Sequence, residues 1–408
     1  MSRGGASLRV GLVCPYSFDT PGGVQNHVLG LARYLDDQGH EPHILAPGDF
    51  PPDGSADPPR SLTDVNLDRQ RFTSAGAAVA VRYNGSTARV NFGPLSAARV
   101  RRWLRHGDFD VLHIHEPITP SISVLALWAA DVPVVATFHT ATPRSRSMQL
   151  AGGAMRAAVE KIDAGIAVSE SARKVVVQHL GRDAVVIPNG FRYADFAPDP
   201  RSLPFRAGSR GGATQSNRRW RTGAHPRVSF LGRLDEPRKG LDTLLDAVPE
   251  LVSSFPGVDV VIAGQGNRPL PVGCRSIGVV TDRDKAELLA TSDVFVAPHL
   301  ARESFGLVLL EAMASGAAVV ASDLDAFADL LAGAPGTRPD LGTTFTAGDP
   351  AALAAAVRGA LERPDAVRLA AAAGASRSYD WSVVGSAISD VYRATRDMTR
   401  PLGRSVRR

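Results

Sequence analysis

The chain has 408 residues, of which 44% are hydrophobic and 21% are charged. This length predicts two domains, because a single core seldom grows beyond about 250 to 300 residues, and the composition excludes a disordered, collagen-like or disulfide-rich protein. The formal net charge of +5 permits an anionic partner such as a phosphate ligand, a lipid surface or nucleic acid, and does not choose among them.

The apolar stretches of the sequence predict no membrane span. The first residues lack the long apolar region of a secretory signal peptide,. The most apolar stretch, Val124–Phe138, is interrupted by Asp131 and Pro133 and is shorter than a spanning helix,. Cys14 and Cys274 are too few for a disulfide framework,. We therefore expect a cytoplasmic protein that meets a membrane only from its surface.

Short apolar runs alternate with longer periodic segments along the first half of the chain. The segment Val24–Asp37 has apolar residues on one stripe and predicts a helix, with Gly39 as its cap,. The short runs predict strands, and their alternation with helices is typical of a parallel sheet. These strands are Leu8–Val13, His43–Ala46, Val111–Ile114, Val132–Phe138, Ala164–Val168 and Ala184–Ile187.

The alternation stops between Phe191 and Pro226, and the stretch from Pro198 to Pro226 carries six arginines and one acid, Asp199. We interpret it as a flexible linker, with a nucleic-acid-binding or lipid-binding arm as the alternative. Further strands are then predicted over Val228–Leu231, Val258–Ala263, Val294–Ala297, Ala318–Ala321 and Thr343–Phe345. The chain thus divides into an α/β domain of residues 1–190, a basic hinge of 191–226, a second α/β domain of 227–378, and a C-terminal helix and tail of 379–408.

A glycine pair, Gly22 and Gly23, ends the segment CPYSFDTPGG between the first predicted strand and the first helix. Glycines at a helix N-terminus let the backbone approach an anion while free N–H groups point at it, although such a pair is also an ordinary turn. The pattern G-x-G-x-x-G is absent here, which argues against a dinucleotide-dependent dehydrogenase.

Two cations flank the turn RLDEPRKG of the second domain. Arg233 follows the strand Val228–Leu231, and Lys239 precedes a periodic segment, Leu241–Leu251, that predicts a helix. Lysine is rare in this chain, with only Lys161, Lys174, Lys239 and Lys285. Cations at a strand end and a helix start suit a diphosphate. A solvated charged turn is the alternative.

Two glutamates lie eight positions apart in ARESFGLVLLEAMASG. If Ser304 caps the helix that follows, Glu303 lies at its mouth and Glu311 lies two turns inside, roughly 12 Å away at 1.5 Å per residue. That distance spans a nucleotide sugar, with one carboxylate on a sugar hydroxyl and the other on a ribose hydroxyl. The apolar neighbours of Glu311 argue against a solvated surface charge.

At these motifs the sequence resembles the retaining GT-B glycosyltransferases of family four, and more closely the actinobacterial phosphatidylinositol mannosyltransferases. The agreement extends over nearly the whole chain outside residues 48–76 and 198–226, in the order CPYSF, PGGVQ, YNGS, FGP, FDVLHIHEP, ATFHT, LGRLDEPRKG, APHL, ESFG and YDWSVV. The resemblance implies two Rossmann-like domains facing a cleft, with the C-terminal helix crossing back to the first domain. It also implies transfer of mannose from GDP-mannose to phosphatidylinositol with retention of configuration.

The resemblance also implies roles for individual residues. His139 and Glu303 would be catalytic; a strand-end histidine is more often structural, but the neighbours Phe138 and Thr140 complete the family motif. The donor would be bound by Gly23, Arg233, Lys239, Glu303, Phe305, Gly306 and Glu311. The acceptor would be bound by Gln25, Tyr83, Asn84, Ser86, Arg89, Thr140 and Arg144, whose hydroxyl, amide and guanidinium groups suit an inositol phosphate.

The segment Leu95–Arg105 predicts an amphipathic helix, with Val100, Trp103 and Leu104 on one stripe. We expect it to lie on an anionic membrane through Arg99, Arg101, Arg102 and Arg105, with Trp103 as an apolar anchor, and an ordinary surface helix is the alternative.

The sequence also bears on partners, cofactors and the identity of the donor base. We expect no required cofactor and no nucleic-acid partner; a divalent cation such as Mg²⁺ has no identified ligand site, and His113-x-His115 lacks a carboxylate that would complete a metal site. The segment Gly264–Val280, near which the family is expected to recognise guanine, is short and contains Pro269 and Pro271. Two alternatives therefore stay open: a sister enzyme that uses a UDP-sugar or a soluble inositol phosphate, and a catalytically inactive binding protein of the same fold.

Overall fold

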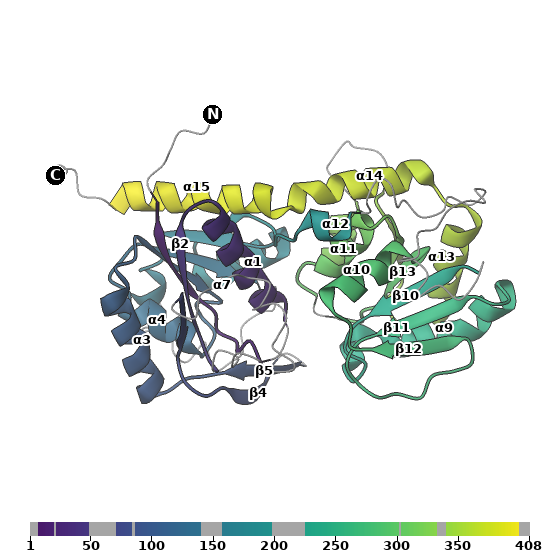
Figure 1. Cartoon of the computed structure of the whole chain (residues 1–408), viewed down its shortest axis with the longest axis horizontal. Helices are drawn as coiled ribbons and strands as arrows, with labels where there is room; N and C mark the ends of the chain where they lie inside the picture. The colour runs from purple at the N-terminus through teal and green to yellow at the C-terminus, as the bar shows by residue number, and fades with distance from the viewer. Residues whose placement is uncertain are drawn as a thin grey trace. The chain divides into compact units, whose positions relative to one another are not determined.

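The computed structural model describes residues 7–19, 22–48, 71–83, 86–139, 157–197, 225–301, 303–332 and 340–399 (Figure 1). Contacts divide the chain into two compact units. The first unit contains the residues up to Gly190 together with those from Trp381 onward, and the second unit runs from Phe191 to Asp380.

The first unit is built on a seven-stranded sheet in which every pair of neighbouring strands is parallel. Its order is β3 (Phe72–Ser74), β2 (Glu41–Ala46), β1 (Arg9–Val13), β6 (Val111–His115), β7 (Val134–Phe138), β8 (Ala164–Ala167) and β9 (Val185–Val186). A separate antiparallel hairpin joins β4 (Val79–Tyr83) to β5 (Ser86–Val90). The helices are α1 (Gly23–Asp37), α3 (Pro94–Gly107), α4 (Ile122–Ala129), α7 (Glu170–Leu180) and α15 (Trp381–Thr399).

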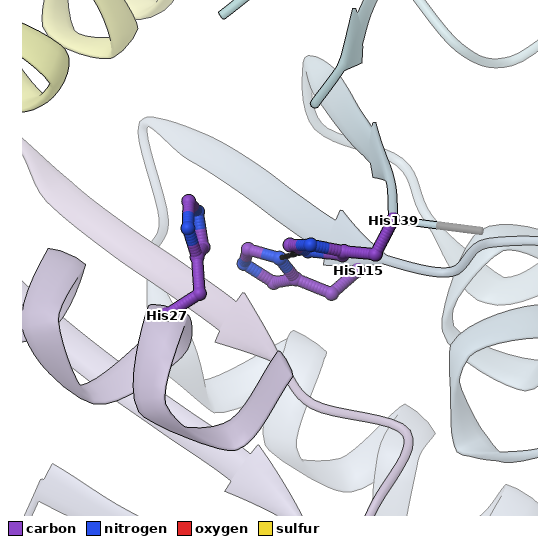
Figure 2. A group of neighbouring side chains, drawn as sticks. All are labelled: His27, His115 and His139. Carbon is purple, nitrogen blue, oxygen red and sulfur yellow. Dashed lines mark hydrogen bonds between the residues drawn. The ribbon is translucent and has the colours of Figure 1, made fainter. Parts of the chain in front are cut away.

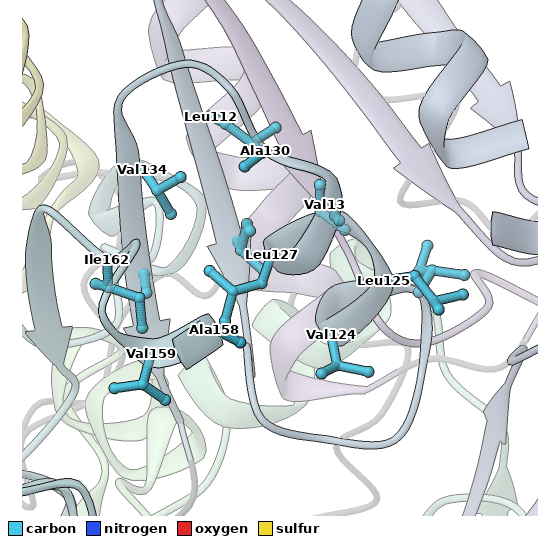
Figure 3. Close-up of a cluster of buried hydrophobic side chains, with 14 of the residues drawn as sticks. Val13, Leu112, Val124, Leu125, Leu127, Ala130, Val134, Ala158, Val159 and Ile162 are labelled. Atoms are coloured by element: carbon cyan, nitrogen blue, oxygen red, sulfur yellow. The ribbon is translucent and has the colours of Figure 1, made fainter. Parts of the chain in front are cut away.

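Two cores cover the two faces of this sheet, because successive strand residues point to opposite sides. On one face, Leu112 and Val134 pack with Leu127 of α4 and with Val159, as Figure 3 shows. On the other face, strand residues such as Val111 and Val135 pack with α1 and α15. His113 and His115 alternate with Leu112 and therefore belong to this second face.

The C-terminal helix belongs to the first unit, as the sequence resemblance implied. α15 packs on α1 and against β6 and β7. Trp381 opens this helix and lies so close to Gly30 that an added Cβ there would be 2.4 Å from its ring. The C-terminal helix, predicted from residue 379, begins two residues later at Trp381, because α14 ends at Ser376 and a short 3₁₀ turn separates it from α15.

The second unit is built on a six-stranded parallel sheet with the order β12-β11-β10-β13-β14-β15. Its strands are β10 (Arg227–Leu231), β11 (Asp259–Ala263), β12 (Cys274–Gly278), β13 (Val294–Ala297), β14 (Ala318–Ser322) and β15 (Thr343–Phe345). Its helices are α8 (Tyr193–Phe196), η3 (Pro237–Lys239), α9 (Leu241–Ser254), α10 (Asp282–Ala290), α11 (Leu307–Ala314), α12 (Asp325–Leu331), α13 (Pro350–Glu362), α14 (Ala366–Ser376) and η4 (Arg377–Tyr379).

The start of the expected hinge is part of the second unit. Phe191 and Phe196 are buried in its core with Phe305, and the backbone N–H of Phe191 donates to the carbonyl of Tyr379. The prediction that residues 191–197 belong to a linker is therefore wrong. Burial of these aromatic side chains in the core fixes this segment to the second unit. Residues 198–224 lie outside the described residues.

Candidate functional site

Three buried histidines meet in the first unit (Figure 2). His27 lies on α1, His115 ends β6, and His139 directly follows β7. The neighbouring parallel strands β6 and β7 end at the same edge of the sheet, where ligands bind in open α/β sheets. Nδ1 of His115 and Nε2 of His139 are 3.0 Å apart, and these two rings stack at 5.3 Å. The ring of His27 approaches both edge-on, at 5.4 Å and 4.9 Å.

Burial keeps these imidazoles neutral. It lowers the pKa of His139 to about 3, an effect that the Asn189 side chain partly opposes. The pKa values of His27 and His115 fall well below the usual value, first through burial and then through the neighbouring histidines. At neutral pH the cluster therefore offers hydrogen-bond donors and acceptors and no positive charge.

Glu116 fixes the backbone beside this cluster. Its carboxylate Oε1 accepts a hydrogen bond of 2.8 Å from the backbone N–H of His139, and its own N–H donates to the carbonyl of Thr137. Glu116 has φ +50°, a left-handed conformation that is uncommon for a residue with a side chain,. Strain of this kind gathers at functional sites.

His113 has a structural role on the same face. Its Nδ1 is 2.6 Å from the hydroxyl of Tyr392 on α15, and its Nε2 is 2.6 Å from Oγ1 of Thr137. Both ring nitrogens are thus occupied. The sequence alternative of a metal site at His113-x-His115 does not fit this geometry.

Within the described residues, the three-histidine cluster is the group whose ligand atoms come within 4.8 Å of one another. Its donor set fits a metal poorly. Nε2 of His139 is already hydrogen-bonded to His115, and the rings of His115 and His139 lie only 26° from parallel. Ligands of a tetrahedral metal converge on one point.

The predicted acceptor residues gather in part around Ser17. The amide of Gln25 donates to the Ser17 carbonyl, the Ser17 N–H donates to the carbonyl of Arg89, and the Arg89 guanidinium is 3.8 Å from Asp19. Tyr83 and Ser86 stand at the adjoining ends of β4 and β5. Asn84, Thr140 and Arg144 lie outside the described residues. Gly23 is the first residue of α1, and an added Cβ there would meet nothing within 4 Å.

In the second unit, the loops that follow β10 and β13 bring the predicted donor residues together. Nζ of Lys239 donates to Oε2 of Glu303 at 3.2 Å, and Nδ1 of His299 lies 3.0 Å from the same oxygen. Gly240 has φ +68°, and an added Cβ would be 1.7 Å from the carbonyl oxygen of Pro298. Only glycine therefore allows these two loops to approach so closely.

The charge of Glu303 is held by its neighbours. Burial favours the neutral acid, but Lys239, His299 and Arg238 outweigh it and hold the pKa of Glu303 below its usual value. All of these contacts involve Oε2. In the described part of the chain, Oε1 thus keeps its capacity to accept from a ligand hydroxyl.

Glu311 pairs with a lysine that sequence reasoning did not single out. Nζ of Lys285 is 2.7 Å from Oε1 of Glu311, 3.4 Å from Asp282 and 5.0 Å from the centre of the Phe196 ring. Burial lowers the pKa of Lys285, but these carboxylates outweigh it and raise the pKa. The rarity of lysine in this chain is the sequence feature that distinguishes Lys285.

The expected cap of this helix is wrong. α11 begins at Leu307, its N-cap is Gly306, and Ser304 precedes it. Gly306 has φ +103° and lies against the ring of Phe327, while Phe305 is buried in the core. Glu303 therefore stands in the loop before the helix, and the distance expected from helical rise does not apply to the two glutamates.

Arg233, the other predicted phosphate ligand, lies on the loop after β10 with Nε 3.6 Å from Asp235. This separation exceeds a hydrogen bond, and Nε is buried without a hydrogen-bond partner in the described structure,. Such a donor suits an anion that binds from outside the chain.

The predicted membrane helix, α3, exposes Arg99, Arg101, Arg102 and Arg105. Trp103 cannot be its anchor: the indole is buried and packs on Phe109 at 4.4 Å between ring centres. The exposed apolar side chains at this end are instead Phe92 and Leu95, 52% and 78% exposed. No helix within the described ranges is long and apolar enough to cross a bilayer.

Comparisons with known proteins agree with this architecture. The model of Glycosyltransferase Family 4 matches residues 21–193, and that of Glycosyl transferases group 1 matches residues 225–363. Among solved structures, a glycosyltransferase from Rickettsia africae aligns with a TM-score of 0.70 and 16% identity over 95% of this chain and 98% of that one. HepE from Anabaena, in complex with UDP and glucose, aligns with a TM-score of 0.68 and 19% identity over 95% of this chain and 100% of that one. These likenesses show the fold.

Curated relatives are much closer in sequence. The phosphatidyl-myo-inositol mannosyltransferase of Mycolicibacterium smegmatis is 46% identical over 396 residues, which cover 94% of this chain and 93% of that protein. The protein of the same name from Propionibacterium freudenreichii is 44% identical over 386 residues and 94% of both chains. This chain is therefore a glycosyltransferase and belongs to the phosphatidyl-myo-inositol mannosyltransferase family.

Proposed function

We propose that this protein transfers mannose from GDP-mannose to phosphatidyl-myo-inositol, with retention of configuration, on the inner face of the plasma membrane. The observation that carries the proposal is the contact of Lys239 and His299 with one oxygen of Glu303, in a chain so similar to enzymes of that name. A carboxylate held charged by these neighbours can accept hydrogen bonds from sugar hydroxyls through its other oxygen.

The donor would lie along the carboxyl edge of the second sheet. Lys239 and the buried Nε of Arg233 would neutralise its diphosphate, with the backbone N–H group at Gly306 adding a donor. Glu311, whose Oε1 is paired with Lys285, would accept from the ribose hydroxyls. Phe305 supports this loop from the core.

The acceptor would lie against the first unit. Gln25 and Arg89 are brought together around Ser17, where an amide and a guanidinium suit a polyol and its phosphate. Tyr83, Asn84, Ser86, Thr140 and Arg144 would complete the pocket. His139 would contact the transferred sugar as a neutral hydrogen-bond partner.

The reaction would be a front-face displacement. The bond between the sugar C1 and the β-phosphate oxygen breaks, and the inositol oxygen bonds to C1 from the same face. The acceptor hydroxyl gives its proton to the leaving phosphate. Arg233 and Lys239 stabilise the charge that develops on the diphosphate, so this scheme uses no cofactor.

A panel of nucleotides and acceptors tests the proposal. Because a ligand that binds only the folded state raises the melting temperature, GDP should raise it more than UDP or ADP. Mannose transfer should require phosphatidylinositol vesicles. A larger shift with UDP, or turnover of a soluble inositol phosphate without vesicles, would assign the chain to a sister activity. Nucleotide binding without turnover of any acceptor would indicate an inactive binding protein.

A further inference from the structure

The hydrogen bond between His115 and His139 constrains where the protons of both rings lie. A neutral imidazole has one N–H and one bare nitrogen. Because Nδ1 of His115 and Nε2 of His139 are 3.0 Å apart, one of them donates and the other accepts. The proton positions of the two rings are therefore coupled, and identifying the donor fixes both tautomers.

The other nitrogen of His115 identifies the donor. In the described part of the chain, Nε2 of His115 is buried without a hydrogen-bond partner. A buried N–H without a partner is rarer in proteins than an acceptor without one. The proton of His115 therefore lies on Nδ1 and is donated to Nε2 of His139. His139 must then carry its own proton on Nδ1.

The backbone holds the two rings in register. Ser123 donates its hydroxyl to the carbonyl of His115 at 2.7 Å, and Glu116 accepts the backbone N–H of His139 at 2.8 Å. The strand pairing of β6 and β7 adds a continuous ladder up to this point. These contacts hold the backbone of both residues in place, so the two side chains start from fixed positions within reach of each other.

We propose that His115 is a positioning residue: it donates from Nδ1 to His139, holds that ring in the Nδ1–H tautomer, and so makes His139 a neutral hydrogen-bond donor and not a base. The inference rests on the proposed function for the step in which His139 contacts the transferred sugar. A neutral donor at that place orients an oxygen of the sugar without adding a positive charge beside C1, and the acceptor proton goes to the leaving phosphate.

Three replacements of His115 test the role of its Nδ1–H. In His115→Asn, the side-chain N–H₂ occupies nearly the place of Nδ1–H; in His115→Gln it reaches toward the place of Nε2; His115→Leu removes the donor. Losing one orienting hydrogen bond should lower kcat about tenfold or more in the Leu and Gln variants. The Asn variant should keep most of the wild-type kcat. The KM for the donor should change little in all three.

The tautomer itself is read by ¹⁵N NMR of histidine-labelled protein, with His139→Ala used to assign the signal. We expect His139 protonated on Nδ1 in the wild type and in His115→Asn, and a mixture of tautomers in His115→Leu. A proton on Nε2 of His139 in the wild type would overturn the inference whatever the activity. Equal losses of kcat in the Asn and Leu variants would also overturn it.

Two further results distinguish this inference from the proposed sugar contact of His139 and from a metal site. If His139 has the expected tautomer but His139→Ala keeps wild-type kcat, the proposed contact with the sugar fails and the positioning of the ring stands. If the purified protein holds one equivalent of zinc that is lost in His27→Ala, the cluster is a metal site and the inference is wrong. Melting temperatures of the variants exclude unfolding as the cause of lost activity.

Discussion

The carboxylate of Glu303 lies within 4 Å of three basic side chains, those of Lys239, His299 and Arg238. We expect Glu303→Gln to lower kcat about tenfold or more, because an amide accepts weaker hydrogen bonds from the sugar and no longer opposes the charge of Lys239. Steady-state kinetics measure this effect. Glu250→Gln is the matched control, since Glu250 forms an exposed ion pair with Arg358 that contributes little. Wild-type kcat in Glu303→Gln would remove Glu303 from the site.

Lys239→Ala should act differently, because its ammonium is proposed to bind the diphosphate in the ground state as well as in the transition state. We expect the KM for the nucleotide sugar and the Kd for GDP to rise about tenfold or more. Titration calorimetry with GDP measures the second quantity. An unchanged Kd with a lowered kcat would mean that Lys239 serves Glu303 and not the phosphate.

The buried histidines should make the stability of the protein fall in acid. Burial lowers the pKa of His113 and His139 from 6.5 to about 3. Between these two pH values the unfolded chain binds more protons, so the free energy of unfolding falls as the pH falls. Urea unfolding at several pH values measures this free energy. Its dependence on pH should be less steep in His113→Asn than in the wild type. His106→Asn, at an exposed position of α3, controls for the loss of one histidine.

At the scale of elements, α15 depends on a close approach to α1. A Cβ at Gly30 would overlap the ring of Trp381 at 2.4 Å, so Gly30→Ala should force the start of α15 away and lower the melting temperature. Gly374 on α14 is the control, since a Cβ there meets nothing within 4 Å. Gly374→Ala should be neutral or stabilise by up to about 1 kcal/mol, the helix preference of alanine. Equal effects of both changes would show that Trp381 does not limit the packing.

The strands beside the candidate site can be predicted from the sequence where the local pattern of apolar residues determines them. The apolar runs of β1, β10 and β13 predict buried parallel strands, and the structure confirms them. Lys239 and Glu303 were expected in one donor site, and they are in contact. These predictions need only the rule that neighbouring parallel strands end at one edge.

The contacts that the sequence did not predict depend on packing between distant segments. His27 lies among the apolar residues of its helix and was not distinguished from them, although the alternation of β6 and β7 places His115 and His139 on the face that α1 covers. Trp103 matched an interfacial anchor in periodicity, but Phe109 and the sheet bury it. Ser304 is not the cap of α11: Gly306, with its left-handed backbone, is the N-cap, and the helix starts two residues later than predicted.

At the scale of the whole molecule, the remaining prediction is that activity depends on an anionic membrane. The proposed acceptor is a lipid whose acyl chains cannot leave the bilayer cheaply, so the enzyme must come to the surface. Four exposed arginines of α3 can each contribute about 1 kcal/mol near such a surface, within a Debye length of about 8 Å. Phe92 and Leu95, exposed at the start of this helix, can insert as the apolar part of the interface.

Replacing Arg99, Arg101, Arg102 and Arg105 together by Ser should abolish co-sedimentation with phosphatidylinositol vesicles and the transfer of mannose to lipid. GDP binding should persist, because the proposed diphosphate ligands Arg233 and Lys239 lie on the other unit. The same four residues changed to Lys keep the charge and should keep sedimentation.

The double variant Phe92→Ser with Leu95→Ser should also weaken co-sedimentation, and most strongly at high salt, where charge attraction is screened. Trp103→Ala should instead lower the free energy of unfolding by about 3 to 5 kcal/mol, the cost of removing a buried aromatic ring. If the variant with all four arginines changed to Ser sediments as the wild type does, α3 is an ordinary surface helix and another surface must hold the lipid.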